Sequence, residues 1–289
     1  MKYKCLKGKK MYISIDIGGT NMRIALVDLE EEAILKLESH LVPQDHKIGI
    51  DSLSKYIEKL SEGRDIQGIG ACFPGIIDEN DMVTTANNLP DWSMKPIKKT
   101  LQERFNIPVR LVHDAKGGAI GEALFGAGRG YDRFVYFIWG TGIGANDVKK
   151  IDEKHYFMFS FENGHHIIDW DGKLCNCGQQ GCPEVYLGGD MLREYFGSDM
   201  NDITDDDPRW DFVVRKAAQV VINTLIFHPV DLFVFNGGVI NRRPFLLDRI
   251  RPIMQKRLTM FPIPKMVLAE KGDQCALFGC AGSFLIDLI

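Results

Sequence analysis

Residues 11–28 read MYISIDIGGTNMRIALVD, and this stretch indicates how the fold begins. Met11 to Asp16 is an apolar run with several β-branched residues, and Met22 to Asp28 is a second one. The short polar turn between them contains Gly18 and Gly19. Two apolar runs joined by a glycine-containing turn are typical of a β-hairpin. We therefore predict an N-terminal hairpin with a polar tip.

Strand and helix patterns alternate along the rest of the chain. The predicted helices are Ser52–Leu60, Lys95–Phe105, Ala115–Phe125 and Phe212–Phe227. The predicted strands are Ile66–Phe73, which ends at a Pro74-Gly75 turn, Pro108–Val112, Arg133–Ile138 and Asp231–Phe235. Asp114 then falls at a junction between a strand and a helix. Two domains are expected in 289 residues, because a single hydrophobic core seldom grows beyond ~250–300 residues.

Three of the predicted strands end in glycine-rich turns: Gly18-Gly19, Gly140-Thr141-Gly142 and Asn236-Gly237-Gly238. Glycines there let backbone N–H groups approach a ligand closely, and phosphates are the usual ligands. One such turn is more often only a turn, but three of them beside Asp16 favour a phosphate site. A carboxylate beside bound phosphate suits Mg²⁺. Neither a P-loop nor a dinucleotide-binding G-x-G-x-x-G after the first strand is present. If the phosphates belong to a nucleotide, it must be held in another way.

Residues 162–184 concentrate side chains that bind metals. His165, Cys175, Cys177 and Cys182 would fill the four positions of a tetrahedral zinc site and leave none for water. Such a site would fix a loop rather than perform chemistry. It would also hold Glu162 and Glu184, which flank the ligands, in place beside a substrate pocket.

Two other interpretations of these cysteines stay open. They could be reduced thiols on a glycine-rich turn, because Cys-x-Cys is less common in zinc loops than Cys-x-x-Cys. A disulfide is the weaker alternative, since the seven cysteines are odd in number. We find neither a signal peptide nor a membrane-spanning apolar run, and we therefore expect a reducing, cytoplasmic location without membrane attachment.

Composition excludes one class of function. The net charge of −4 argues against a nucleic-acid surface, which needs concentrated Lys and Arg. The one basic cluster, Lys2 to Lys10, precedes the first strand and reads as a short solvated tail. The apolar fraction of 45% supports a folded core throughout the chain.

Taken together, these residues resemble the ROK family of sugar kinases and related repressors, over nearly the whole chain from residue 11. The family's motifs are matched by Asp16-Ile-Gly18-Gly19-Thr20, Pro74-Gly75, an Asn-Leu-Pro at Asn88, the segment from His113-Asp114 to Glu122, and Gly140-Thr141-Gly142. The family's zinc-loop pattern G-H…C-x-C-G-x-x-G-C-x-E is matched in full. This last pattern is specific, and it agrees with the separate argument from metal ligands.

The resemblance implies an α/β protein with a two-domain actin-like (ribonuclease H-like) ATPase fold, an interdomain cleft and a zinc-stapled loop. It implies a small domain made of residues 1–114 and a C-terminal helix at 274–289. Residues 115–273 would form a larger domain with the zinc loop and the nucleotide-binding turns. ATP, Mg²⁺ and a hexose or amino sugar would bind in the cleft, structural Zn²⁺ would bind the loop, and the protein would form a homodimer.

The same resemblance assigns roles to single residues. Nucleotide contacts would be Asp16, Gly18, Gly19, Thr20, Gly140, Thr141, Gly142, Gly237 and Gly238. Sugar contacts would be Gly75, Asn88, His113, Glu162, His165 and Glu184, with His165 binding zinc through one ring nitrogen and sugar through the other. Asp114 would be the general base that accepts the proton of a sugar hydroxyl, by default at carbon 6. From residue type alone, Asp114 could instead cap a helix, and the two glutamates could be solvated surface carboxylates.

Several positions depart from the family pattern. His113 stands where the family usually has Asn before the catalytic Asp, and His is larger and can titrate. Phe157, Phe159 and Phe161 replace small residues before the zinc loop, where they would either narrow the sugar site or fill space in the core. Asn236 replaces the first glycine of an expected Gly-Gly-Gly, and Gly144 is followed by Ala145-Asn146, so nucleotide affinity could differ.

The leading hypothesis is an ATP-dependent kinase of a hexose or N-acylhexosamine. The alternative is a catalytically weak sugar sensor of the same family without a DNA-binding domain, since only ten residues precede the first predicted strand. A third reading is a zinc-stapled nucleotide-binding protein with no sugar substrate. Residue types alone do not select the sugar, because specificity depends on which hydroxyls leave buried partners unpaired.

Overall fold

The computed structural model describes residues 10–289 except 79–81, 87–88 and 199. The chain forms two compact units. The first extends to Phe125 and includes 274–287, and the second comprises 126–273 with Leu288 and Ile289. The boundary therefore falls after Phe125, whereas the sequence placed it after Asp114. The expected C-terminal helix at 274–289 is shorter: α9 covers Cys275–Gly282, and a short strand β13 follows at Asp287–Leu288.

The first unit is built on a five-stranded sheet. Its order is β3 (Ala33–Leu41), β2 (Asn21–Asp28), β1 (Met11–Ile17), β4 (Ile66–Phe73) and β7 (Val109–His113). β1 and β2 pair antiparallel as the predicted hairpin, whereas β1, β4 and β7 run parallel to one another. A separate two-stranded ribbon joins β5 (Ile76–Ile77) to β6 (Val83–Thr85).

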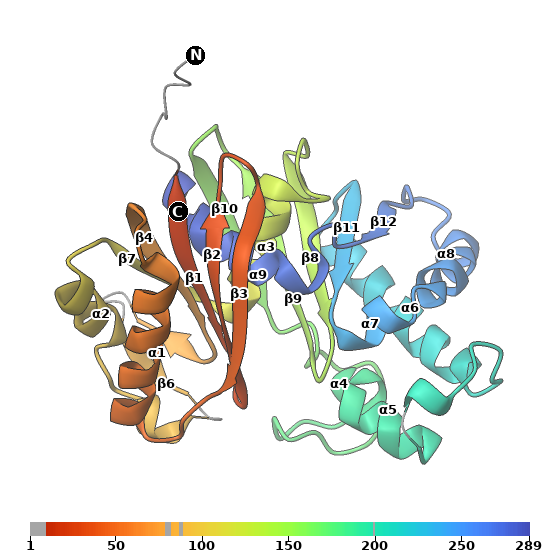
Figure 1. The fold of residues 1–289 in the computed structure, drawn as a ribbon. Coiled ribbons are helices and arrows are strands. Elements are labelled where there is room, and N and C mark those ends of the chain that lie inside the picture. The colour runs from red at the N-terminus through yellow and green to blue at the C-terminus, as the bar shows by residue number, and fades with distance from the viewer. Residues whose placement is uncertain (1–9, 79–81, 87–88, 199) are drawn as a thin grey trace. The chain divides into compact units, whose positions relative to one another are not determined.

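Helices cover both faces of this sheet (Figure 1). Ile13 and Ile15 point to the face packed by α1 (His46–Ser61) and α2 (Ile97–Phe105). Tyr12 points to the opposite face, where α3 (Asp114–Phe125) and α9 pack. This division follows from the alternation of side chains along a strand. α1 starts earlier than the predicted Ser52 because the Asp45 carboxylate caps its N-terminus by accepting from the N–H of Ile48.

Close packing of α3 on α9 depends on glycine. A Cβ on Gly279 would lie 1.7 Å from the carbonyl oxygen of Gly117, and one on Gly121 would lie 2.0 Å from that of Cys275. The two helix backbones therefore touch without side chains between them. The helix predicted at Ala115–Phe125 is rich in alanine and glycine, and this composition permits the close contact.

Replacing Gly279 by Ala should destabilise the first unit strongly. The added methyl group meets backbone rather than a movable side chain, and overpacking typically costs about 1–3 kcal/mol or more. We expect the melting temperature to fall by about 5 °C or more in a thermal unfolding scan. The control is Gly144→Ala, whose new Cβ would have Ile138 Cδ1 as its nearest neighbour, 4.0 Å away. Equal stability of the two variants would contradict the packing argument.

The second unit contains a six-stranded sheet. From one edge its strands are β12 (Lys265–Leu268), β11 (Leu232–Asn236), β8 (Arg133–Trp139), β9 (Ile143–Lys150) and β10 (His155–Phe161). At the outer edge of β10, β13 completes the sheet, and the N–H of Ile289 donates to the carbonyl of Tyr156. Its helices are α4 (Glu184–Leu187), α5 (Gly189–Phe196), α6 (Trp210–Phe227), α7 (Gly238–Arg242) and α8 (Phe245–Arg257).

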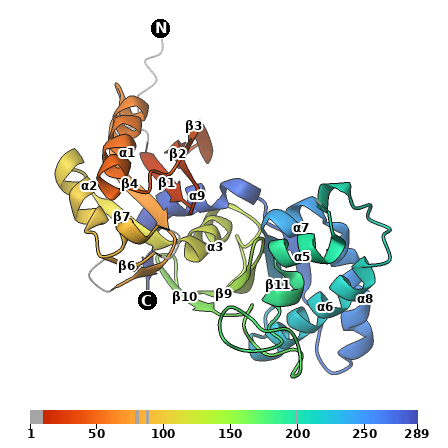
Figure 2. The same cartoon turned by 90° about the horizontal axis from the view of Figure 1, so that it is seen from below.

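The core of the second unit joins its sheet to its helices. α6 and α8 lie side by side (Figure 2), and their apolar residues pack with those of β8 and β11. In the described part of the chain, no helix is both long enough and apolar enough to cross a membrane.

The phenylalanines of β10 correct an expectation from the sequence. Phe157 and Phe159 are 43% and 51% exposed, so these two neither fill the core nor line a described cavity. Phe161 is half-buried and stacks on His228, with the ring centroids 4.0 Å apart. The alternation of side chains along β10 places Phe157 and Phe159 on the side opposite the buried Tyr156 and Met158.

Candidate functional site

The parallel strands of the first unit bring their carboxyl ends to one edge of the sheet. Asp16 on β1 is in register with Cys72 on β4, and Phe73 is in register with His113 on β7. The turn after β1, the Pro74-Gly75 turn after β4 and Asp114 after β7 therefore share one edge. Ligands of open α/β sheets bind at such edges. Residues separated by almost one hundred positions in sequence are neighbours here.

Asp16 carries an ion pair at this edge. The guanidinium of Arg23, on the adjacent strand β2, donates through both Nε and Nη2 to the Oδ2 atom of Asp16. Oδ1 of Asp16 has no hydrogen-bond partner among the described residues. One carboxylate oxygen is thus available to a cation or to bound water, which is the kind of ligand Mg²⁺ takes. The sequence argument gave no role to Arg23.

Asp114 is the first residue of α3. Its Oδ1 accepts from the N–H of Ala115 at 2.7 Å and lies 3.1 Å from Nδ1 of His113. Desolvation raises the pKa of the Asp114 carboxyl group, although 48% of the side chain is exposed, and the nearby Asp16 charge adds to the rise. His113 and the Ala115 N–H act in the opposite direction. A carboxylate whose pKa is raised is a better proton acceptor than an ordinary one.

Gly75 takes a backbone conformation that favours glycine, with φ of 120°. A Cβ there would lie 1.9 Å from the carbonyl oxygen of Thr85 in β6, so no other residue fits this turn without rearrangement. Thr20 is exposed at the tip of the β1–β2 hairpin, beside Gly18 and Gly19. Asn88 lies outside the described residues.

In the second unit, the two predicted glycine turns lie against each other. Gly237 has φ of 121°, and a Cβ on it would lie 2.4 Å from the carbonyl oxygen of Trp139. The N–H of Gly189 donates to the carbonyls of Gly140 and Thr141, both at 2.9 Å. Together the turns border a cavity of about 290 Å³, which we call the turn cavity. Its lining residues are Gly140, Thr141, Gly189, Arg193, Met200, Asn201, Gly238, Val239 and Arg242.

Asn236 does not line this cavity. Its side-chain amide donates to the Tyr136 hydroxyl at 2.8 Å and to the Gly272 carbonyl at 3.1 Å, and its oxygen accepts from Asn241. The side chain that replaces the family's first glycine thus stabilises the turn from the inside. Asn146, after Gly144 and Ala145, is also buried and accepts from the Ser160 hydroxyl within the sheet.

The four predicted metal ligands converge. The ligand atoms of His165, Cys175, Cys177 and Cys182 all lie within 4.8 Å of one another. Nδ1 of His165 is 3.6 Å from Sγ of Cys175, and the sulfurs of Cys177 and Cys182 are also 3.6 Å apart. Ligands on a tetrahedral zinc ion, with Zn–S near 2.3 Å and Zn–N near 2.0 Å, stand about 3.5–3.8 Å apart. The cluster could therefore hold zinc, and its cysteines are free rather than joined in a disulfide.

Glu184 lies between the metal cluster and the end of the Gly140-Thr141-Gly142 turn. Its Oε2 accepts from the N–H of Ile143 at 3.3 Å, and its Oε1 lies 3.9 Å from Nε2 of His165. A Cβ on Gly142 would lie 2.5 Å from Oε2, so this glycine is needed for the close approach. Glu184 also lines a second cavity, of about 400 Å³, which shares Thr141 with the turn cavity.

Glu162 lies on the same loop as the metal cluster but in a different environment. It is exposed and lines a smaller cavity of about 180 Å³ with Phe161, Asn163 and His166. Its carbonyl accepts from the N–H of His165, which closes the turn that leads into the metal ligands.

Sequence reasoning missed Arg193 and Arg242 in the turn cavity, because no motif surrounds them.

These features define a class of protein. Two α/β units, one with acidic residues at the ends of parallel strands and one with paired glycine turns, fit the actin-like ATPase fold. The model of the ROK family matches residues 12–285. This chain therefore belongs to the ROK family.

Characterised relatives and a solved structure agree with this assignment. The chain is 27% identical over 307 residues to glucokinase of Streptomyces coelicolor, covering 93% of this chain and 96% of that protein. It is 29% identical over 271 residues to the xylose repressor of Bacillus spizizenii, with 85% and 69% covered. The structure of a ROK family glucokinase from Streptomyces griseus in complex with glucose and AMPPNP aligns with a TM-score of 0.75 at 27% identity. This alignment covers 94% of this chain and 98% of that one.

Proposed function

We propose that this protein is an ATP-dependent sugar kinase that phosphorylates a hexose or an N-acylhexosamine, by default at the carbon 6 hydroxyl. The observation that carries the proposal is Asp114. It stands at the same sheet edge as Asp16, partly exposed, with a raised pKa. The similarity to glucokinases supports a sugar hydroxyl as the acceptor of the phosphoryl group.

In this mechanism Asp114 accepts the proton of the attacking hydroxyl. Phosphoryl transfer depends mainly on alignment and on neutralising charge, so the remaining residues position the reactants. Oδ1 of Asp16 would hold Mg²⁺, which supplies charge neutralisation at the donor phosphates. Gly18, Gly19 and Thr20 would contact those phosphates in the first unit. Gly140, Thr141, Gly142, Gly237 and Gly238 would contact the nucleotide in the second.

The residues expected to contact the sugar lie partly in the second unit and partly in the first. From the second unit, Glu162 and Glu184 would accept hydrogen bonds from hydroxyls, and Nε2 of His165 would face the sugar while Nδ1 binds zinc. A metal-bound imidazole keeps its other nitrogen free for such a contact. The geometry of the ring supports this division, since Nδ1 faces Cys175 and Nε2 faces Glu184. Gly75, Asn88 and His113 would contribute from the first unit.

The test is ADP release by the zinc-loaded protein with ATP and Mg²⁺ across a panel of hexoses and N-acetylhexosamines. We expect one sugar to stimulate ADP release well above the rate without sugar. NMR of the product then shows which hydroxyl of the sugar carries the phosphate. A protein that binds ATP and sugar but shows no stimulation with any sugar would contradict the kinase assignment.

His113 should set the pH dependence of the reaction. Its charge lowers the pKa of Asp114, so His113→Asn should raise that pKa further. Because the base must be deprotonated, kcat/KM falls as the pH drops through this pKa. The acid limb of the pH profile should therefore move to higher pH in the variant, by a shift that a pH series of kcat/KM measures. An unchanged acid limb would show that His113 does not act on the base.

A second candidate function is favoured by the similarity to the xylose repressor. The protein would then be a sugar-responsive regulator that binds ligand without turning it over. The same panel separates the two functions. Thermal stabilisation by one sugar without any ADP release would support the regulator.

A further inference from the structure

The lining of the turn cavity carries positive charge. Two of its residues, Arg193 and Arg242, are cations, and none is a carboxylate. The two glycine turns form another part of the lining, with Gly140 on one turn and Gly238 on the other. Backbone N–H groups at glycine turns and guanidinium groups both favour anions. A ligand of this cavity is therefore expected to carry negative charge.

Arg193 already pairs with a carboxylate, whereas Arg242 does not pair with one in the described part of the chain. Nη2 of Arg193 lies 2.5 Å from a carboxylate oxygen of Asp190. Within the described residues, the Arg242 guanidinium forms neither a hydrogen bond nor an ion pair, and the side chain is exposed. Its Nη1 atom reaches back along α7 to within 3.8 Å of the position that a Cβ on Gly238 would take. The unpaired cation thus stands directly over one of the glycine turns.

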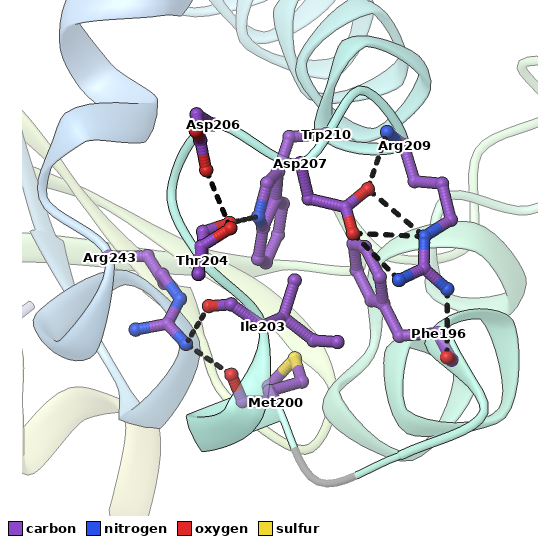
Figure 3. Close-up of polar contacts among 9 residues, drawn as sticks. All are labelled: Phe196, Met200, Ile203, Thr204, Asp206, Asp207, Arg209, Trp210 and Arg243. Carbon is purple, nitrogen blue, oxygen red and sulfur yellow. Dashed lines mark hydrogen bonds and ion pairs between the residues drawn. The ribbon is translucent and has the colours of Figure 1, made fainter.

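The neighbouring Arg243 has the opposite role. It donates through Nη2 to the carbonyl oxygens of Met200 and Ile203, and its guanidinium lies 5.8 Å from the centroid of the Trp210 ring (Figure 3). Arg243 therefore fixes the segment that supplies Met200 and Asn201 to the cavity wall. Arg243 thus builds the wall, while the residue before it, Arg242, faces the cavity.

Further contacts hold the same segment from its other side. Arg209 donates to the carbonyl of Phe196 at 2.8 Å and forms an ion pair with Asp207, and Trp210 Nε1 donates to the carbonyl of Thr204 at 3.0 Å (Figure 3). The described part of the segment between α5 and α6 is thus tied to the body of the second unit. Because this wall is ordered before the ligand binds, binding does not have to supply the free energy needed to order it.

We propose that Arg242 binds the phosphate chain of the phosphoryl donor and gives the turn cavity its preference for polyphosphorylated ligands. This inference rests on the proposed kinase function and adds a donor-binding residue to it. The fork of N–H groups on a guanidinium matches two phosphate oxygens at once, which a lysine ammonium cannot do. Arg193, whose charge is shared with Asp190, contributes less.

The experiment is isothermal titration of the full-length protein with ADP, adenosine and inorganic tripolyphosphate. For Arg242→Ala we expect the Kd of ADP and of tripolyphosphate to rise about 10–100-fold, as for the loss of a hydrogen bond to a charged group. The Kd of adenosine should change less than about twofold. Arg242→Lys should fall between the wild type and Arg242→Ala, because charge is kept and the fork is lost. The wild-type affinities for ADP and tripolyphosphate tell which source of phosphates the cavity prefers.

The matched control is Arg215→Ala, which removes one exposed cation from α6 without touching the cavity lining. Its ADP affinity should equal that of the wild type. Unchanged ADP affinity in Arg242→Ala would overturn the inference and leave the proposed function intact. An equal loss of ADP and adenosine binding would also overturn it, since the contact would then be to the nucleoside. Failure of the wild-type protein to bind either phosphate ligand would overturn the inference and the proposed function together.

Discussion

Replacing Asp114 by Asn should lower kcat by about 10²–10⁴-fold while the affinity for sugar changes little. The amide has nearly the same shape as the carboxylate but cannot accept the proton of the attacking hydroxyl. Initial rates of ADP release at saturating ATP, with the Kd of the sugar from thermal shift, measure the two effects separately. A variant that keeps more than about a fifth of the wild-type kcat would exclude Asp114 as the base.

The melting temperature of the Asp114→Asn variant shows whether a loss of activity comes from unfolding. The pKa of Asp114 is raised in the folded protein, so the ionised carboxylate is disfavoured there relative to the unfolded chain. Any stabilisation by this group is present only below its unfolded pKa and is lost as the pH rises through the folded pKa. At neutral pH, Asp114→Asn should therefore leave the melting temperature unchanged or raise it. Asp65→Asn makes the same chemical change at an exposed site in the first unit and should preserve kcat.

Removing one buried ligand of the metal cluster should abolish both zinc binding and turnover. Cys182 is fully buried, and its thiolate would be one of four ligands, so Cys182→Ser leaves an incomplete site. We expect bound zinc, measured by plasma mass spectrometry, to fall from about one per chain to near zero. The melting temperature should fall by about 10 °C, and sugar-stimulated ADP release should fall more than about 100-fold.

The exposed residue Lys173 offers a control on the same loop. Lys173→Ala shortens a side chain near the cluster without removing a ligand atom, and its zinc content should match the wild type. Chelation of the wild-type protein followed by zinc addition should lower and then restore the rate. A zinc-free wild-type protein with full activity would contradict a structural role for the metal.

Much of the fold was predictable where local patterns decide it. The hairpin formed by β1 and β2 and the boundaries of β4 agree with the sequence, because a turn or a change of periodicity marks each end. The start of α1 was missed since its signal, the Asp45 cap, precedes the apolar repeat. The boundary between the two units also lies later in the chain than expected, after Phe125 rather than after Asp114. α3 belongs with the first unit through its backbone contact with α9, a pairing across about 150 residues that no local pattern shows.

The candidate site divides in the same way. The four predicted metal ligands lie close together in sequence, so their spacing alone predicted the His and Cys cluster that the structure contains. The direction of a side chain is set by tertiary packing, and here the sequence was less informative. Asn236 turns inward to Tyr136, Phe157 and Phe159 face solvent, and Arg242 faces a cavity while Arg243 does not. Roles for Asp114, Glu162 and the nucleotide turns stay predictions until the variants are measured.

The two contacts of Glu184 have a thermodynamic consequence. One carboxylate touches both the turn that would receive the nucleotide and the histidine that would bind zinc. Equilibrium linkage is reciprocal, so zinc that strengthens nucleotide binding by some factor must itself be held more tightly by that same factor when nucleotide is present. On that premise, the Kd of zinc should be lower for the nucleotide-bound protein than for the free protein. Metal retention would then depend on how much nucleotide the surroundings supply.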